Sequence, residues 1–361
     1  MTRLATILIL SCAVLSAASA AGAQAAAQQS APAAPSSSPP AALDLRPKFA
    51  PGQSLRYRME LVTKTETSSS GVVQDPQGPS QLIVTWDATV RIDVLPPDAA
   101  PPANAAPQGQ SPAPALRLRM TYEKSTATIQ SDSYDPSAAG IQDQYQRLQG
   151  HAVEFALDAH GKITGVSGGD DVFETPQAAR DAQAWVEQLS SGLGAPGTSA
   201  APGQHWDSEE PAPGIPLPGM TWHTDSTYQR NEPCRESPPA AAGPPSSATA
   251  GGETCAVILT RVSLVPPKSQ PKSESGANKK SAAPSAADPN SPGAIANGMQ
   301  TTGTWTGSSE SVIYVSLRTG WVVSVTQSGD EQMDVTMFTE HLDSIRYAGT
   351  IHSHIDLLLL P

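Results

Sequence analysis

Residues 82–94, LIVTWDATVRIDV, constrain the fold of this chain more than any other stretch. Apolar or small side chains occupy every second position from Leu82 to Val94, and most residues between them are polar. This alternation is typical of a strand that buries one face, whereas an amphipathic helix has a period of about 3.6. The run is also far longer than the roughly 5–6 residues of an ordinary strand. It therefore predicts a long antiparallel strand in a strongly curved sheet, of the half-barrel or β-clam type.

The same alternation recurs along the chain and predicts a mainly β protein of the α+β class. Further strands are expected at 54–65, 116–122, 221–230, 254–265, 311–317, 321–327, 333–339 and 351–360. Residues 151–167 and 312–325 read as hairpins, with Gly161 and Gly320 in their turns. A change of parity after Tyr122 predicts a β-bulge near residues 124–126.

One helix is expected at about 176–191. Thr175 can cap it, Pro176 suits the first helical position, and a glycine at 192 or 194 can end it. Its apolar positions fall on one face at helical spacing: Ala178, Ala182, Trp185 and Leu189. We expect this helix to cover one face of a sheet.

Composition divides the chain into two β modules, each with its own curved antiparallel sheet. The first module is expected at 44–194 and includes the helix; a Gly/Pro-rich linker at 195–218 leads to the second at 219–361. Stretches rich in Ala, Pro and Ser predict a flexible leader at 24–43 and disordered inserts at 96–114, 237–252 and 266–298.

The first residues have the pattern of a secretory signal peptide. Arg3 precedes an apolar run from Leu4 to Leu15, which is too short to span a bilayer, and small-x-small motifs follow. We expect residues 1–23 to be removed after Ala23, which predicts a periplasmic or secreted protein with no transmembrane segment.

Cleavage would leave two cysteines, Cys234 and Cys255. An even number of cysteines in an exported chain predicts a disulfide, and the alternative is a pair of free thiols. Closing a loop of this size stabilises a fold by about 3 kcal/mol.

Little in the sequence indicates chemistry. A net charge of −12 disfavours nucleic acid and anionic membrane surfaces as partners. We find no phosphate-binding glycine loop and no nucleophile motif. The pair Asp170-Asp171 reads as a solvated turn rather than a calcium site, and His352 and His354 supply only two ligands of a possible metal site. We therefore assign no catalytic residue, cofactor or metal, and we expect the protein not to be an enzyme.

Four motifs together resemble a known family. They are G-Q-x-L-R-Y-x-M at 52–59, L-x-G-H-x-V-E-F-x-L-D-x-x-G-K at 148–162, P-G-M-T-W at 218–222 and R-T-G-W at 318–321. The combination resembles a family of exported bacterial proteins whose domain has no assigned function, which implies a β-rich fold and supplies no catalytic residues. More loosely, the long strands with a covering helix resemble periplasmic lipoprotein-carrier half-barrels, at the level of fold.

Two functions fit these observations. The first is a non-catalytic structural or protein-interaction role in the cell envelope, with an unidentified envelope protein as partner. The alternative is a periplasmic carrier or binder of an apolar ligand, such as an acyl chain or lipid, on the concave side of a curved sheet.

Overall fold

The computed structural model describes residues 42–71, 78–96, 116–132, 136–158, 162–168, 186, 199–212, 215–234, 253–267, 300–338 and 344–361. The elements are β1 (Ser54–Gly71), β2 (Ser80–Leu95), β3 (Leu116–Ser131), α1 (Pro136–Arg147), β4 (Ala152–Leu157), β5 (Ile163–Ser167), β6 (His205–Pro211), β7 (Thr221–Pro233), β8 (Thr254–Val265), β9 (Gln300–Ser316), β10 (Val322–Phe338) and β11 (Ser344–Leu360). The predicted mainly β class with long strands is confirmed.

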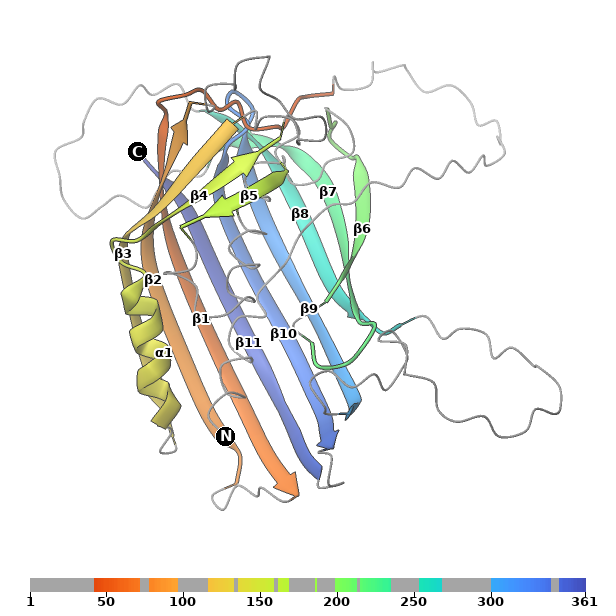
Figure 1. Cartoon of the computed structure of the whole chain (residues 1–361). Helices are drawn as coiled ribbons and strands as arrows, with labels where there is room; N and C mark the ends of the chain where they lie inside the picture. The colour runs from red at the N-terminus through yellow and green to blue at the C-terminus, as the bar shows by residue number, and fades with distance from the viewer. Residues whose placement is uncertain are drawn as a thin grey trace, which may run out of the picture.

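All eleven strands form one open antiparallel sheet (Figure 1), in the order β5-β4-β3-β2-β1-β11-β10-β9-β8-β7-β6. We expected two sheets, and the structure corrects this to one. The reason is the position of β11, which pairs with β1 on one side and with β10 on the other. The strands of the two predicted modules, β1–β5 and β7–β11, therefore belong to one continuous sheet that is joined through the pairing of β11 with β1.

The alternation of apolar and polar residues in the sequence corresponds to alternating burial along the strand. In β2, every second residue from Val84 to Val94 is buried and the residues between them are half-buried. The predicted hairpins are present as β4–β5 and β9–β10, and Gly320 has the positive φ of 71° that its turn requires. The bulge falls at Glu123, one residue before the predicted position.

Several element boundaries differ from the predictions. The two strands expected at 321–327 and 333–339 are one strand, β10, which continues through Gly329. Residues 195–218, expected as a linker, contain the edge strand β6. The signal peptide and the predicted inserts lie outside the described residues apart from a few residues at their borders. The helix at 176–191 also lies outside them, except for Val186, which is helical and buried.

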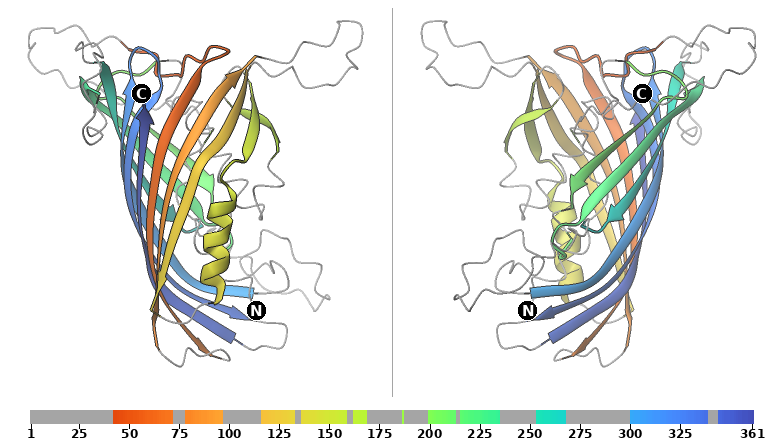
Figure 2. Two further views of the ribbon diagram at one scale, coloured as in Figure 1. Left: turned by 90° about the vertical axis from the view of Figure 1, so that its left-hand side faces the viewer. Right: turned by 90° about the vertical axis from the view of Figure 1, so that its right-hand side faces the viewer.

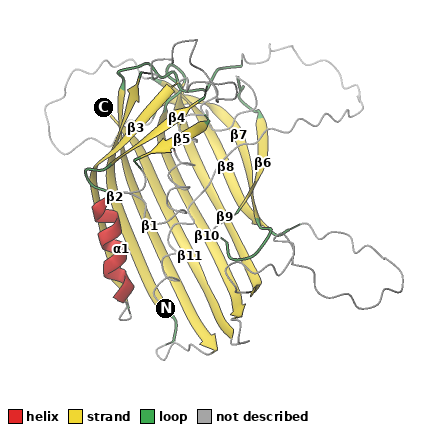
Figure 3. Cartoon of the chain, in the orientation of Figure 1, coloured by secondary structure: helices red, strands yellow, loops and turns green. Residues whose placement is uncertain are grey.

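The helix α1 lies where we expected only a polar region (Figure 3). Ile141 and Tyr145 are buried and contact the core, and Gly150 follows the helix with a φ of 84°. Signals for it exist in the sequence: Asp135 and Pro136 are typical of a helix start, and Ile141, Tyr145 and Leu148 have helical spacing.

The sheet is strongly curved, and α1 lies on its concave side (Figure 2). Trp86 of β2 fixes the helix there, since its ring centroid lies 5.2 Å from that of Tyr145 and its Nε1–H donates to Ser125 Oγ at 2.9 Å. Trp86 points to the concave side, because it contacts α1 there. Residues paired in register share a face, so the pairing identifies which residues of the other strands point to the concave side as well.

Candidate functional site

The concave face carries two apolar clusters. The main cluster extends across the sheet from Ile163 of β5 to Trp206 of β6 and includes Ile141 and Tyr145 of α1. Its buried members include Tyr57, Val90, Tyr122, Phe155, Tyr228, Ile258 and Ile313. The second cluster joins β8, β9, β10 and β11 to the segment between β6 and β7. It comprises Ala212, Ile215, Met220, Leu264, Trp305, Met333, Val335 and Ile351.

Between the two clusters runs a band of small polar side chains, which we call the hydroxyl belt. Its members are Thr63, Thr224, Ser226, Thr260, Ser309, Ser311, Gln327 and Ser353. Register places them in two adjacent rows: Leu61, Ile355, Gln327, Ser311, Thr260 and Ser226 in one, and Thr63, Ser353, Gly329, Ser309, Val262 and Thr224 in the other. The belt thus crosses the sheet from β1 to β7 on the same face as the core.

Four of the eight belt residues are linked to one another in two hydrogen-bonded pairs. The hydroxyls of Ser226 and Thr260 lie 3.0 Å apart, and Gln327 Nε2 donates to Ser309 Oγ at 3.4 Å. The hydroxyl of Thr63 differs, because it is buried and has no hydrogen-bond partner. A buried hydroxyl without a partner costs free energy, and such groups are uncommon in folded proteins.

The floor of the concave face is less covered at its centre than under α1. Met59, Val325, Ile355 and Leu359 are half-buried apolar side chains of β1, β10 and β11 that pack against the main cluster. By contrast, Val84, Val90 and Val94 on β2 are fully buried. We call the four half-buried residues the central floor. It is apolar surface adjacent to the hydroxyl belt that remains partly accessible to solvent.

Two glycines shape the lower border of the belt. A Cβ at Gly329 would lie 2.9 Å from Ser309 Cβ, and a Cβ at Gly307 would lie 2.9 Å from Glu331 Cγ. The absence of a side chain at Gly307 therefore makes room for the carboxyl of Glu331 on the concave face.

Glu331 is the acidic group nearest the belt. Its Oε2 accepts a hydrogen bond from Trp305 Nε1 at 2.8 Å. Burial raises the pKa of the Glu331 carboxyl, and the hydrogen bond from Trp305 partly opposes this rise.

Replacing Glu331 with Gln is expected to stabilise the fold at neutral pH and to have little effect in acid. Because the folded-state pKa of Glu331 is raised, wild-type stability is greatest when the carboxyl is protonated and falls as the pH rises through its titration. The glutamine amide does not ionise, so the variant does not lose this stability as the pH rises. Its amide oxygen can still accept the hydrogen bond from Trp305. Urea unfolding of both proteins over a pH series measures the difference; a difference that is constant with pH or larger in acid would contradict the argument.

Charge is divided sharply between the two faces of the sheet. Among the described strand residues, register places all lysines and arginines on the convex side: Arg56, Arg58, Lys64, Arg91, Arg117, Arg119, Lys124, Arg230, Arg261 and Arg346. Several pair with carboxylates there, as Arg261 does with Glu310 at 2.8 Å. On the concave side, the charged residues at described strand positions are Glu331 and, on the edge strand, Glu210.

The histidines that the sequence analysis considered as metal ligands lie on the convex side. His352 and His354 share that face, as predicted, but each pairs with its own aspartate: His352 Nδ1 lies 2.5 Å from Asp330, and His354 Nε2 lies 3.0 Å from Asp356. Within the described ranges, no group of three or more His, Cys, Asp or Glu residues could hold a metal ion. Asp170 and Asp171 lie outside those ranges.

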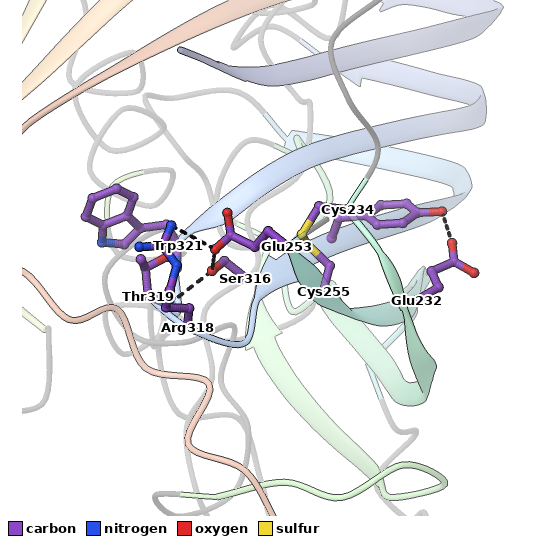
Figure 4. Close-up of a disulfide and its surroundings, with 9 residues drawn as sticks. Glu232, Cys234, Glu253, Cys255, Ser316, Arg318, Thr319 and Trp321 are labelled. Carbon is purple, nitrogen blue, oxygen red and sulfur yellow. Dashed lines mark hydrogen bonds and ion pairs between the residues drawn. A yellow bond between two sulfur atoms is a disulfide. The ribbon is translucent and has the colours of Figure 1, made fainter. Parts of the chain in front are cut away.

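The predicted disulfide between Cys234 and Cys255 is present (Figure 4), and register places Cys255 on the convex side of the sheet. Cys234 directly follows β7 and Cys255 is the second residue of β8, so the bond ties these two strands together. It packs with Val257 and Tyr314 in a small buried cluster. The disulfide lies on the opposite face from the hydroxyl belt and is a structural element.

The apolar positions of the concave face were predictable from the sequence, whereas the hydroxyl belt was not predicted. A signal for it exists, because Thr63, Ser309 and Thr224 occupy the same parity as the core residues of their strands. A polar side chain at a core position marks either a hydrogen-bonded network or a binding site.

Comparison with known proteins gives little. No family model matches the chain, and no curated protein matches it. A solved structure of lipovitellin, described by its lipid–protein interactions, has a TM-score of 0.41 and 11% identity over 87% of this chain and 26% of that one. The OccK11 (OpdR) structure from Pseudomonas aeruginosa has a TM-score of 0.20 and 8% identity over 87% of this chain and 100% of that one. Both likenesses are too low to indicate a shared function.

A search of the described residues for helices found none long and apolar enough to cross a membrane.

Proposed function

We propose that this protein is exported and, without being an enzyme, binds an apolar or amphipathic ligand on the concave face of its sheet. The observation that supports this best is the central floor: Met59, Val325, Ile355 and Leu359 are half-buried apolar side chains that lie around the buried Leu357 on one face of the sheet. Concave apolar surfaces with a few polar groups are where proteins bind small molecules. The disulfide and the signal-peptide pattern of residues 1–23 support export.

At one edge of the sheet, β6 gives little support to the other candidate, docking of a protein on an edge strand. β6 presents the exposed acidic residues Asp207 and Glu209 and ends at Pro211. Charged side chains and proline on an edge strand are typical of edges protected against pairing with another chain.

The test uses the chain from residue 24 with its disulfide formed. Bound lipid is sought by mass spectrometry after solvent extraction, and affinity for an apolar fluorescent dye is measured. Val325→Lys places a charge on the central floor and is expected to weaken dye binding by about tenfold or more, since burying an unpaired charge is costly. Ser324→Lys, one residue away on the convex side, is the matched control and should bind the dye as wild type does.

A second variant tests the central floor in case Val325→Lys does not fold. Ile355→Trp fills the central floor without adding charge and should also reduce dye affinity, while thermal unfolding monitors the fold. The proposal would be wrong if the wild-type protein carried no lipid and bound no dye, or if both floor variants bound the dye normally.

A further inference from the structure

We infer that the polar group of the ligand is uncharged and lies on the hydroxyl belt beside Thr63, while its apolar tail lies on the central floor. This inference rests on the proposed function and specifies its substrate class: a neutral amphipathic lipid, with a hydroxyl or ester head group, rather than a fatty acid, a phospholipid or a cationic amphiphile.

The charge of the concave face disfavours an anionic head group. An anionic head group needs a cation close by when it is removed from water. No lysine or arginine occupies the concave side at any described strand position. Arg147, at the end of α1, has its guanidinium directed to the carbonyl of Asp143 in the same helix. No described strand residue would thus supply a counter-charge to a carboxylate or phosphate bound near Glu331.

A cationic head group is disfavoured as well. Glu331 is the carboxyl closest to the belt, and it already accepts the Trp305 indole hydrogen. Since burial favours the protonated form of this carboxyl, it is a weak partner for an ammonium group. Hydroxyl and amide groups remain as the ligands of the belt, and both donate and accept hydrogen bonds, as a neutral head group does.

The position of Thr63 indicates where the head group binds. Thr63 is 2% exposed and lies on the concave face between Ser353 and Val84, and its buried hydroxyl has no hydrogen-bond partner. An unpaired hydroxyl at this position is explained by a ligand that completes its hydrogen bond.

The two apolar clusters differ in exposure, and this difference gives the direction of the ligand's apolar tail. The second cluster is closed, because Trp305, Met333, Val335 and Ile351 are all buried. The central floor, on the other side of the belt, is the half-exposed apolar surface. A ligand whose head group hydrogen-bonds at Thr63 therefore extends its tail along Ile355 toward Leu359.

The experiment compares three ligands with the same alkyl chain, each below its micelle concentration: a monoacylglycerol, the fatty acid at a pH where it is ionised, and the alkylamine. Displacement of the apolar dye gives the affinities. The monoacylglycerol is expected to bind at least about tenfold more tightly than either charged ligand.

Thr63→Val is the variant that tests the contact, because valine has nearly the same shape and no hydroxyl. It should weaken monoacylglycerol binding by about fivefold, the usual effect of one hydrogen bond, and leave dye affinity unchanged. Thr85→Val on the convex side of β2, which pairs with Val62 next to Thr63, is the matched control and should change neither.

The outcomes separate the two proposals. If a charged ligand binds as tightly as the monoacylglycerol, or if Thr63→Val leaves monoacylglycerol binding unchanged, the inference is overturned while ligand binding on the central floor stands. If the wild-type protein binds neither dye nor any of the three lipids, the proposed function fails and the inference fails with it.

Discussion

A chain that stops at Phe338, and so lacks β11, is expected to have no cooperative unfolding transition. β11 pairs with β1 from Arg56↔Leu360 to Gly71↔Ile345 and with β10 from Ser324↔Leu358 to Phe338↔Ser344. Its removal leaves both neighbours with unpaired backbone groups and exposes the core around Leu357. The loss exceeds the roughly 5–15 kcal/mol by which domains are stable. Circular dichroism and calorimetry of the truncated chain measure the effect.

A peptide of residues 344–361 provides the control for this truncation. Added to the truncated chain during refolding, it should restore part of the transition, because the missing ladder can form between two molecules. Removal of Pro361 alone, which is exposed and outside β11, should leave the melting temperature unchanged. A truncated chain that unfolds as cooperatively as wild type would show that β11 is dispensable.

Trp86→Ala is expected to destabilise the fold by about 3–5 kcal/mol, the usual cost of deleting a buried aromatic side chain. Trp86 is a buried residue whose ring lies between those of Tyr122 and Tyr145, at 6.4 and 5.2 Å. Its indole donates to Ser125 Oγ, which in turn donates to the carbonyl of Tyr145 in α1 at 2.5 Å. Deletion of the indole therefore removes both the apolar and the polar attachment of α1.

Hydrogen exchange distinguishes this local effect from a general loss of stability. Amides of α1 should exchange much faster in Trp86→Ala, whereas amides of β8 and β9, on the other half of the sheet, should change only with global stability. Trp86→Phe keeps most of the ring and loses the hydrogen bond, so its cost should be smaller, about 1–2 kcal/mol. Equal destabilisation by Ala and Phe would mean that ring packing contributes nothing.

The individual strands were predictable because a local pattern specifies them. The alternation at Leu82–Val94 reports burial directly, and no distant contact can change the parity of a strand that long. The disulfide followed from the number of cysteines and the strands that flank them. The tip at Gly320 followed from turn chemistry.

The assembly of the strands was not predictable from local patterns. That β11 pairs with β1 depends on residues about 300 positions apart, and the sequence of each strand suits many partners. The helix α1 was missed because its residues have a mean composition typical of a polar loop, although Ile141 and Tyr145 have the right spacing. The hydroxyl belt was missed because Thr63 and Ser353 interrupt the apolar pattern separately in each strand and form a band only when the strands are in register.

The central place of β11 has a consequence for biosynthesis. Ten strands are made before it, and until it arrives β1 and β10 each offer an open edge to the same missing segment. The sheet is incomplete until β11 has been made, and two crowded molecules can pair by exchanging this segment. Strand-exchanged dimers are therefore the characteristic misassembly of this topology, and their yield should rise with protein concentration during refolding.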